Sequence, residues 1–373
     1  MKLALHLMEP WLIKNQDVPY NLGESGMVDM TLKELLDVTG DSHEELLKLS
    51  FKNIDTRGTL ALRETIASFY NDIDPDMILL TTGTSEALFI YYSIRLEPNA
   101  NVVVPFPAFQ TLYEVPRYIG FDVRLLPLRR ENNFIPDLNE LRGLVDENTK
   151  IIVLNTPHNP TGQIYSDEII SGFMEIAEEN NAEILADEHY RFINYSDKEI
   201  LPSLYGLSSK VVAAGSMIKC FGCVGLRVGW IIGPKEFIDD ARDFKDYTTH
   251  TLCSINDYLA NTSLVNWEKI IPRHRNWVLD NIARFRELID KHSDFLGWIE
   301  PQGGLVAFPY FKDTSIKGEA FLSKLVEKRG VSMLPGEAFE TPGYFRIGFG
   351  VTPEVFDEAM NNLSGFIENE EYL

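Results

Sequence analysis

The sequence predicts an α/β protein, with a large domain built on a mostly parallel β-sheet and a smaller α+β domain. Two observations carry this prediction. Between about residues 76 and 234, short runs rich in Val, Ile and Leu alternate with helical patterns, as in parallel sheets whose two faces are covered by helices. After about residue 240 the pattern becomes helical and then mixes helices with short strands.

Seven apolar or β-branched segments are expected to form the strands of the large sheet. In chain order they are MILLTT (77–82), NVVVP (101–105), FDVRLLPL (121–128), KIIVLN (150–155), AEILADEHY (182–190), KVVAAGS (210–216) and LRVGWIIGP (226–234). Helices are expected between them, at Ser85–Ile94, at 137–145, and from a cap at Ser166 to about Asn180.

The smaller domain is expected to begin with a helix over NWVLDNIARFRELID (276–290), followed by strands at LVAFPYF (305–311) and YFRIGFG (344–350). A chain of 373 residues is longer than one compact core usually serves. We therefore expect residues 40–270 to form the large domain, and residues 1–39 together with 271–373 to form the small one.

Composition excludes several classes of function. The net charge of −22 disfavours nucleic acid as a partner, because phosphates require a basic surface. The longest apolar runs are shorter than ten residues, so we expect no membrane span, and the first residues do not have the pattern of a signal peptide.

Three cysteines give no disulfide framework, which favours a cytoplasmic location. Cys220 and Cys223 form a C-x-x-C pair, but no second pair at ligand spacing completes a zinc site. We expect these cysteines to serve packing, and we expect no metal site.

A single lysine, Lys219, lies among small and apolar residues in GSMIKCFGCVGLRVGW (215–230). Burying a lysine is costly unless its charge changes or a ligand occupies it. A lysine at a strand end can form a Schiff base with a carbonyl cofactor, and pyridoxal phosphate is the obvious candidate. That cofactor also requires an anion site, an acid beside its ring nitrogen, and flat apolar contact for its ring.

Residues at other strand ends match these requirements. Asp187 follows an apolar strand, and its carboxylate would keep the pyridine nitrogen protonated, so that the ring acts as an electron sink. Tyr190 and Asn159 are expected to hydrogen-bond the phenolic oxygen of the cofactor. Phe109 is expected to stack on the ring.

The phosphate is expected to lie at TTGTSEAL (81–88), where a glycine turn opens into a helix. The N-terminal amides of that helix, at Thr84 and Ser85, favour an anion. Ser216 would add a hydroxyl group, and Arg227 would add a guanidinium fork.

This set of motifs resembles the fold type I pyridoxal-phosphate enzymes of the aspartate aminotransferase superfamily. The N-x-P-x-N-P-T-G motif stands at 155–162, D-E-x-Y at 187–190, and S-x-x-K followed by G-x-R-x-G at 216–229. The resemblance implies a homodimer with shared active sites and an amino acid substrate, whose α-carboxylate would be held by Arg346 with Asn159 nearby.

Two departures point away from ordinary transamination. The family usually has a tyrosine that reaches the neighbouring subunit's phosphate, and the matching position here is Asn53. The N-terminal substrate loop reads NLGESGMVDMTLKELL (21–36) and lacks the usual proline.

The departing pattern is similar to the capreomycidine synthase-like branch of the superfamily, and to the guanitoxin-pathway cyclase that forms L-enduracididine. The resemblance implies a lyase-type cyclase that takes a hydroxylated L-arginine, with 4-hydroxyarginine favoured, eliminates water and closes the guanidine into a ring. A guanidinium requires carboxylates. Glu9 and Glu24 are the candidates, with Ser25 as a further substrate-binding residue, although both carboxylates also fit solvated surface positions.

Two other functions are weighed against this one, and one point about the product is undetermined. The chain also fits an aminotransferase that uses a 2-oxo acid acceptor. A regulatory protein that only senses the cofactor is disfavoured, because no basic DNA-binding segment is present. The position of the leaving hydroxyl and the ring size stay undetermined.

Overall fold

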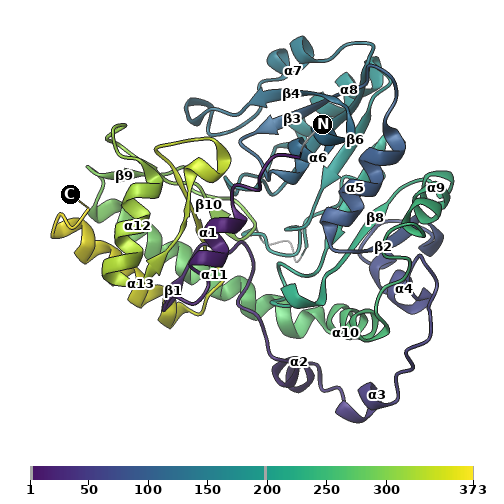
Figure 1. Ribbon diagram of the computed structural model, residues 1–373, viewed down its shortest axis with the longest axis horizontal. Coiled ribbons are helices and arrows are strands. Elements are labelled where there is room, and N and C mark those ends of the chain that lie inside the picture. Colours follow the sequence, from purple (N-terminus) through teal and green to yellow (C-terminus); the bar gives the residue numbers. More distant parts are fainter. Residues whose placement is uncertain (1–2, 197–199, 373) are drawn as a thin grey trace.

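A computed structural model describes residues 3–196 and 200–372 of the chain. The large sheet has seven strands in the order β2-β8-β7-β6-β5-β3-β4, and every strand is parallel to the others except β8. This confirms the expected fold class (Figure 1). The strands are β2 (Ile78–Thr82), β3 (Asn101–Phe106), β4 (Asp122–Pro127), β5 (Thr149–Asn155), β6 (Glu183–Asp187), β7 (Val211–Ser216) and β8 (Val228–Ile232).

Helices cover both faces of this sheet, as the apolar strands require. In β5, Ile151 and Val153 pack with one set of helices, whereas Ile152 and Leu154 pack with the other, because successive side chains of a strand point to opposite faces. The first face is covered by α5 (Thr84–Arg95), α6 (Thr111–Ile119) and α9 (Lys235–Lys245), and the second by α4 (Leu60–Ala67), α7 (Leu138–Leu144), α8 (Asp167–Glu179) and α10 (Ser254–Val265).

Two expected strands are shorter than the sequence suggested. The segment 182–190 is a strand only to Asp187, after which the backbone turns, with the Arg191 amide donating to the Glu188 carbonyl. The segment 226–234 is a strand only from Val228, because Arg227 has a left-handed backbone (φ 51°). The expected helix cap at Ser166 is confirmed, since its hydroxyl accepts from the Ile169 amide.

The C-terminal part packs around α11 (Trp267–Lys291), which is longer than the expected helix at 276–290. Pro272 lies inside α11. Because an interior proline usually interrupts a helix, the start of α11 at Trp267 could not be predicted from the sequence. The boundary expected at residue 270 therefore falls within a continuous helix. The division into two domains stays a prediction.

The expected strand at 305–311 is instead two short strands, β10 (Val306–Ala307) and β11 (Tyr310–Phe311). Pro309 separates them, because proline has no N–H to donate to a ladder. The expected strand at 344–350 is shorter, as β14 (Phe345–Gly348). The remaining elements are β9 (Leu296–Gly297), α12 (Gly318–Arg329), β12 (Val331–Ser332), β13 (Leu334–Pro335) and α13 (Pro353–Glu368).

The N-terminal segment joins the C-terminal part rather than the large sheet. After α1 (Glu9–Lys14), the strand β1 (Tyr20–Asn21) pairs in parallel with β12. The helices α2 (Leu32–Thr39) and α3 (His43–Leu47) then lead to α4 (Figure 1). Residues 1 and 2 of the expected 1–39 unit lie outside the described residues. No helix in the described ranges is long and apolar enough to cross a membrane.

Candidate active site

One edge of the large sheet collects the predicted site residues. Because β2, β6 and β7 run parallel, their carboxyl ends meet at the same edge, and this brings together Gly83 after β2, Asp187 at the end of β6 and Ser216 at the end of β7. The strand β8 runs in the opposite direction and begins at this edge. Arg227, immediately before β8, therefore arrives at the same place.

A cavity of about 620 Å³ opens at this edge, between the sheet, the N-terminal segment and β14. Every predicted site residue except Tyr190 lines it. They are Glu9, Glu24, Ser25, Thr84, Ser85, Phe109, Asn159, Asp187, Ser216, Lys219, Arg227 and Arg346.

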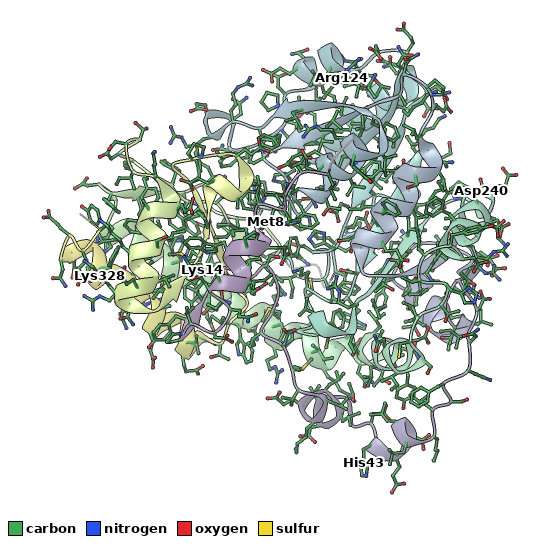
Figure 2. The ribbon with its side chains drawn as sticks, viewed as in Figure 1. Met8, Lys14, His43, Arg124, Asp240 and Lys328 are labelled. Carbon is green, nitrogen blue, oxygen red and sulfur yellow. The ribbon has the colours of Figure 1, made fainter. Side chains whose placement is uncertain are left out.

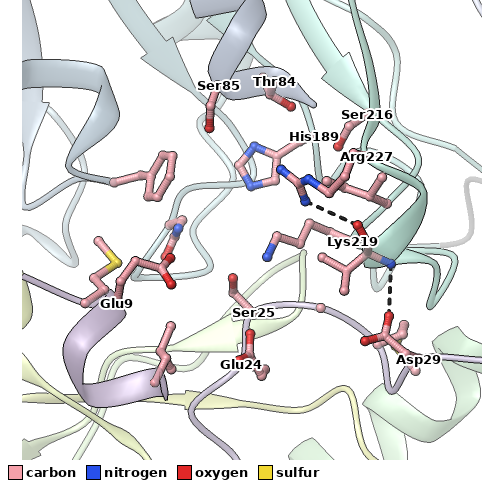
Figure 3. A pocket seen from close by; sticks show the side chains of 18 of the residues that line it. Glu9, Glu24, Ser25, Asp29, Thr84, Ser85, His189, Ser216, Lys219 and Arg227 are labelled. Atoms are coloured by element: carbon pink, nitrogen blue, oxygen red, sulfur yellow. Dashed lines mark hydrogen bonds between the residues drawn. The ribbon is translucent and has the colours of Figure 1, made fainter. Parts of the chain in front are cut away.

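Lys219 extends its side chain into the middle of this cavity (Figure 3). Burial lowers the pKa of its amine, and the carboxylates of Glu24 and Glu9 oppose part of that shift. No ion pair involves Lys219 among the described residues. A lysine in this setting carries its amine in the neutral form more readily than a surface lysine does, as a nucleophile or base requires.

The N-terminus of α5 and the residues around it fit an anion. Gly83 precedes the helix with a positive φ of 76°, and no side chain caps the helix. A Cβ at Gly83 would lie 2.7 Å from Nη2 of Arg227, so only glycine lets this guanidinium approach the turn. The hydroxyl of Ser216 is buried and has no hydrogen-bond partner among the described residues. An unpaired hydroxyl, a guanidinium and helix amides together match the phosphate of the cofactor.

Asp187 is 1% exposed at the end of β6 and pairs with His189, whose Nδ1 lies 2.6 Å from the Asp187 Oδ1. Its backbone carbonyl accepts a hydrogen bond from the side-chain Nδ2 of Asn155. The carboxylate therefore has a fixed orientation toward the cavity. A buried carboxylate held in this way fits the protonated ring nitrogen of the cofactor.

Arg346 is a buried guanidinium that faces the cavity from β14. Its Nη1 donates to the Asn159 Oδ1 at 3.2 Å and its Nη2 donates to the Gly23 carbonyl at 2.8 Å, while its Nε has no partner among the described residues. No carboxylate of the described chain pairs with it. Burial lowers the pKa of Arg346. A buried, uncompensated guanidinium is costly, and a substrate carboxylate would supply the missing charge.

Tyr190 is the one predicted site residue that does not line the cavity. Its hydroxyl is buried and donates to the Ser25 carbonyl at 2.9 Å. The phenol thereby ties the end of β6 to the N-terminal loop. Its expected contact with the phenolic oxygen of the cofactor stays a prediction.

Glu9 and Glu24 reach the cavity from the N-terminal segment, on the side opposite the sheet edge (Figure 3). Both side chains are exposed, and both contribute to the electrostatic field at Lys219 and at Arg346. Asn53, the position that departs from the family pattern, is exposed and does not line the cavity.

Several lining residues were missed by sequence reasoning. His189 is the most important, because it holds the Asp187 carboxylate. Its position two residues after a strand-end aspartate was the available signal. Asp29 was also missed, and its carboxylate accepts from the Val224 amide at 2.9 Å. No sequence signal places Asp29 here, because the contact spans 195 residues.

Comparisons with known proteins agree with this geometry. The family "Aminotransferase class I and II" matches residues 21–363. The chain is 30% identical over 326 residues to an aspartate aminotransferase of Pyrococcus horikoshii, covering 84% of this chain and 82% of that one. It is 27% identical over 345 residues to a capreomycidine synthase of Streptomyces vinaceus, covering 92% and 88%. The solved structure of the PLP-dependent cyclase OrfR is similar with a TM-score of 0.91 and 27% identity, covering 99% of this chain and 98% of that one.

These similarities confirm the expected architecture and the expected pyridoxal phosphate cofactor. The residues at the sheet edge fit that cofactor, since they offer an anion site, a ring-nitrogen acid and an amine in one cavity. The chain is a pyridoxal-phosphate-dependent enzyme that belongs to the aminotransferase class I and II family.

Proposed function

We propose that this enzyme is a cyclase that acts on a hydroxylated L-arginine, with 4-hydroxyarginine favoured. It eliminates water and closes the guanidine onto the side chain, giving a cyclic guanidino amino acid such as L-enduracididine. One observation carries the proposal. The cavity holds a buried arginine suited to an α-carboxylate and, facing the same lysine, two carboxylates suited to a cationic side chain.

The cofactor, when bound, withdraws electrons from the Cα of the amino acid. The residues that would hold it are Thr84, Ser85, Ser216 and Arg227 at the phosphate and Asp187 at the ring nitrogen. Phe109 would cover the ring.

Lys219 supplies the proton transfers of the reaction. Burial lowers the pKa of its amine, which suits it to remove the Cα proton. Loss of a second proton, from Cβ, lets the hydroxyl on the next carbon leave as water. A guanidine nitrogen then forms a bond to that carbon, and protons return to Cβ and Cα. The balance is one water released for each ring closed, with no oxidant or reductant.

Substrate orientation falls to residues on the other side of the cavity. Arg346 would hold the α-carboxylate through its fork, with Asn159 keeping the guanidinium in place. Glu9 and Glu24 would bind the guanidinium of the substrate, and Ser25, next to Glu24 in the chain, also lines the cavity (Figure 3). The similarity to capreomycidine synthase and to the cyclase OrfR supports this assignment.

The second candidate function is an aminotransferase that uses a 2-oxo acid acceptor. The similarity to aspartate aminotransferase favours it. A homodimer with shared active sites and a cytoplasmic location also stay predictions for either activity.

The test incubates the holoenzyme with 4-hydroxyarginine and, separately, 3-hydroxyarginine in deuterium oxide without any keto acid. A cyclase releases one water per turnover, incorporates deuterium at Cα and, where the γ-hydroxyl leaves, at Cβ, and gives a cyclic product by mass and NMR. Turnover should not change when 2-oxoglutarate is added. A requirement for a keto acid, together with an open-chain 2-oxo product, would establish the aminotransferase instead.

A further inference from the structure

The side chain of Gln110 holds the backbone of the N-terminal segment through both ends of its amide. Its Oε1 accepts from the Leu7 amide at 2.7 Å, and its Nε2 donates to the Leu5 carbonyl at 2.9 Å. Gln110 is itself 3% exposed and lies directly before α6 in the large domain. The side-chain amide thus offers one acceptor and one donor to the segment, which is the pattern that a neighbouring β-strand would offer to a single residue.

Few other contacts hold this stretch of chain. Leu3, Leu5 and Leu7 are 50%, 84% and 40% exposed, so their apolar packing contributes little here, and the ring of His6 lies 6.2 Å from that of Phe109. Within the described residues, the backbone of residues 3–7 makes no other hydrogen bond to distant parts of the chain. Gln110 therefore provides the long-range backbone hydrogen bonds that hold this segment.

The same segment delivers Glu9 to the cavity. Met8, which follows the clamped stretch, is buried and lines the cavity between the two parts of the molecule (Figure 2). Glu9 is the first residue of α1, and the chain beyond α1 is anchored by the pairing of β1 with β12. The segment is thus held at one end by Gln110 and at the other by the pairing of β1 with β12 (Figure 1). Between these two anchors, Met8 and Glu9 line the cavity.

We propose that Gln110 is a positioning residue, whose amide fixes the N-terminal segment over the cavity and thereby sets the affinity for substrate through Glu9. The part that concerns affinity rests on the proposed function, because it assumes that Glu9 contacts the substrate side chain. The part that concerns the segment rests only on the two hydrogen bonds. Gln110 needs no contact with substrate or cofactor for this role, although its neighbour Phe109 lines the cavity.

The experiment compares the holoenzyme with Gln110→Ala, which removes both hydrogen bonds, and Gln110→Glu, which keeps the acceptor for Leu7 and loses the donor to Leu5. Gln302→Ala is the matched control, because Gln302 also accepts from a backbone amide, that of Ile164, and does not line this cavity. Deuterium exchange at the Leu7 amide, measured without substrate, shows whether Gln110 protects that amide. Steady-state kinetics then show whether loss of the two hydrogen bonds changes the KM for the substrate.

We expect exchange at Leu7 to be about tenfold faster in Gln110→Ala, since two hydrogen bonds of ordinary net strength are lost. Gln110→Glu should fall between this variant and the wild type, and Gln302→Ala should match the wild type. The KM for the amino acid substrate should rise about fivefold in Gln110→Ala, with kcat and the cofactor absorbance band unchanged.

Unchanged exchange at Leu7 in both Gln110 variants would overturn the proposal. Faster exchange with an unaltered KM would overturn the link to substrate affinity. Exchange at Leu7 is measured without substrate, so it tests the hold of Gln110 on the segment even if the enzyme proves to be an aminotransferase. The KM comparison tests the link to Glu9 and is interpreted only if the proposed function holds, which the separate product assay decides.

Discussion

The sheet edge and the N-terminal segment form opposite sides of one cavity, but they are built differently. Asp187 and Ser216 are 1% exposed at the ends of strands in the core. Glu9 and Glu24 are exposed residues of the N-terminal segment, although the backbone on either side of Glu24 accepts hydrogen bonds from Arg346 and Tyr190. In our proposal the buried side holds the cofactor and the exposed side chains contact the substrate.

The difference has an energetic basis. A side chain at the buried edge is held by its strand, which pairs along its length with neighbours on both sides, so its position is set by the whole core. An exposed carboxylate contributes only about 0.2–1 kcal/mol to an ion pair in solvent, unless the substrate excludes water from it. Substitutions on the two sides should therefore differ in size and in kind.

The largest effect is expected for Lys219→Ala, at the centre of the buried side. Loss of the amine removes both the attachment point for the cofactor and the base at Cα, so turnover should fall by at least about a thousandfold. Borohydride should fix the yellow cofactor to Lys219 in the wild type and not in the variant. Turnover near the normal rate in the variant would contradict the assignment.

A smaller effect is expected for Arg346→Lys, which keeps the positive charge but loses the planar guanidinium that can donate two parallel hydrogen bonds to a carboxylate. A lysine reaches fewer of the partners that Arg346 now has, so the KM for every amino acid substrate should rise by roughly tenfold to a hundredfold. The cofactor absorbance should stay the same, because Arg346 does not lie at the phosphate or the ring nitrogen. Arg329→Lys, on the surface in α12, is the control. An unaltered KM would remove Arg346 from the substrate site.

On the exposed side, Glu24→Gln and Glu9→Gln should each raise the KM by about threefold to tenfold, with kcat and thermal stability close to wild type. The effect should be confined to substrates with a cationic side chain, since glutamine keeps the size and loses the charge. Glu44→Gln, an exposed glutamate in α3, serves as the matched control. An equal rise in KM for neutral and cationic substrates would show that these carboxylates do not bind the side chain of the substrate.

The smallest effect on catalysis is expected for His274→Gln, which instead alters the pH dependence of stability. Burial lowers the pKa of His274 to about 4, and its Nδ1 bonds the Cys220 carbonyl next to Lys219. Between about pH 6.5 and 4 the unfolded chain binds a proton at this histidine that the folded chain does not, so stability falls as the pH falls. The wild type should lose about 1–2 kcal/mol more than the variant between pH 7 and pH 5.

Urea unfolding at the two pH values measures this difference. The histidine His158 is also buried, with a pKa lowered to about 3 by burial, and it is present in both proteins, so its contribution cancels. Parallel pH profiles for wild type and variant would show that His274 is not a source of acid sensitivity.

The large sheet and most of the cofactor site could be predicted from the amino-acid sequence alone. The apolar strands with their polar ends are local features, and the carboxyl ends of parallel strands necessarily meet at one edge. Lys219, Asp187 and Ser216 could therefore be placed together from sequence patterns. The same reasoning failed where the backbone departs from regular pairing, as at Pro272 inside α11 and at Pro309 between β10 and β11.

The way in which the N-terminal segment meets the sheet edge depends instead on tertiary packing. The hydrogen bond from Tyr190 to the Ser25 carbonyl spans 165 residues, and the bonds from Gln110 to the N-terminal backbone span more than 100. The periodicity of the sequence does not reveal such contacts, because each joins residues that are far apart in the chain and meet only through tertiary packing. Local chemistry in the sequence thus identified the cofactor, while the position of Glu9, and with it the proposed substrate contact, depends on long-range contacts on both sides of it, namely the amide of Gln110, the burial of Met8 and the pairing of β1 with β12.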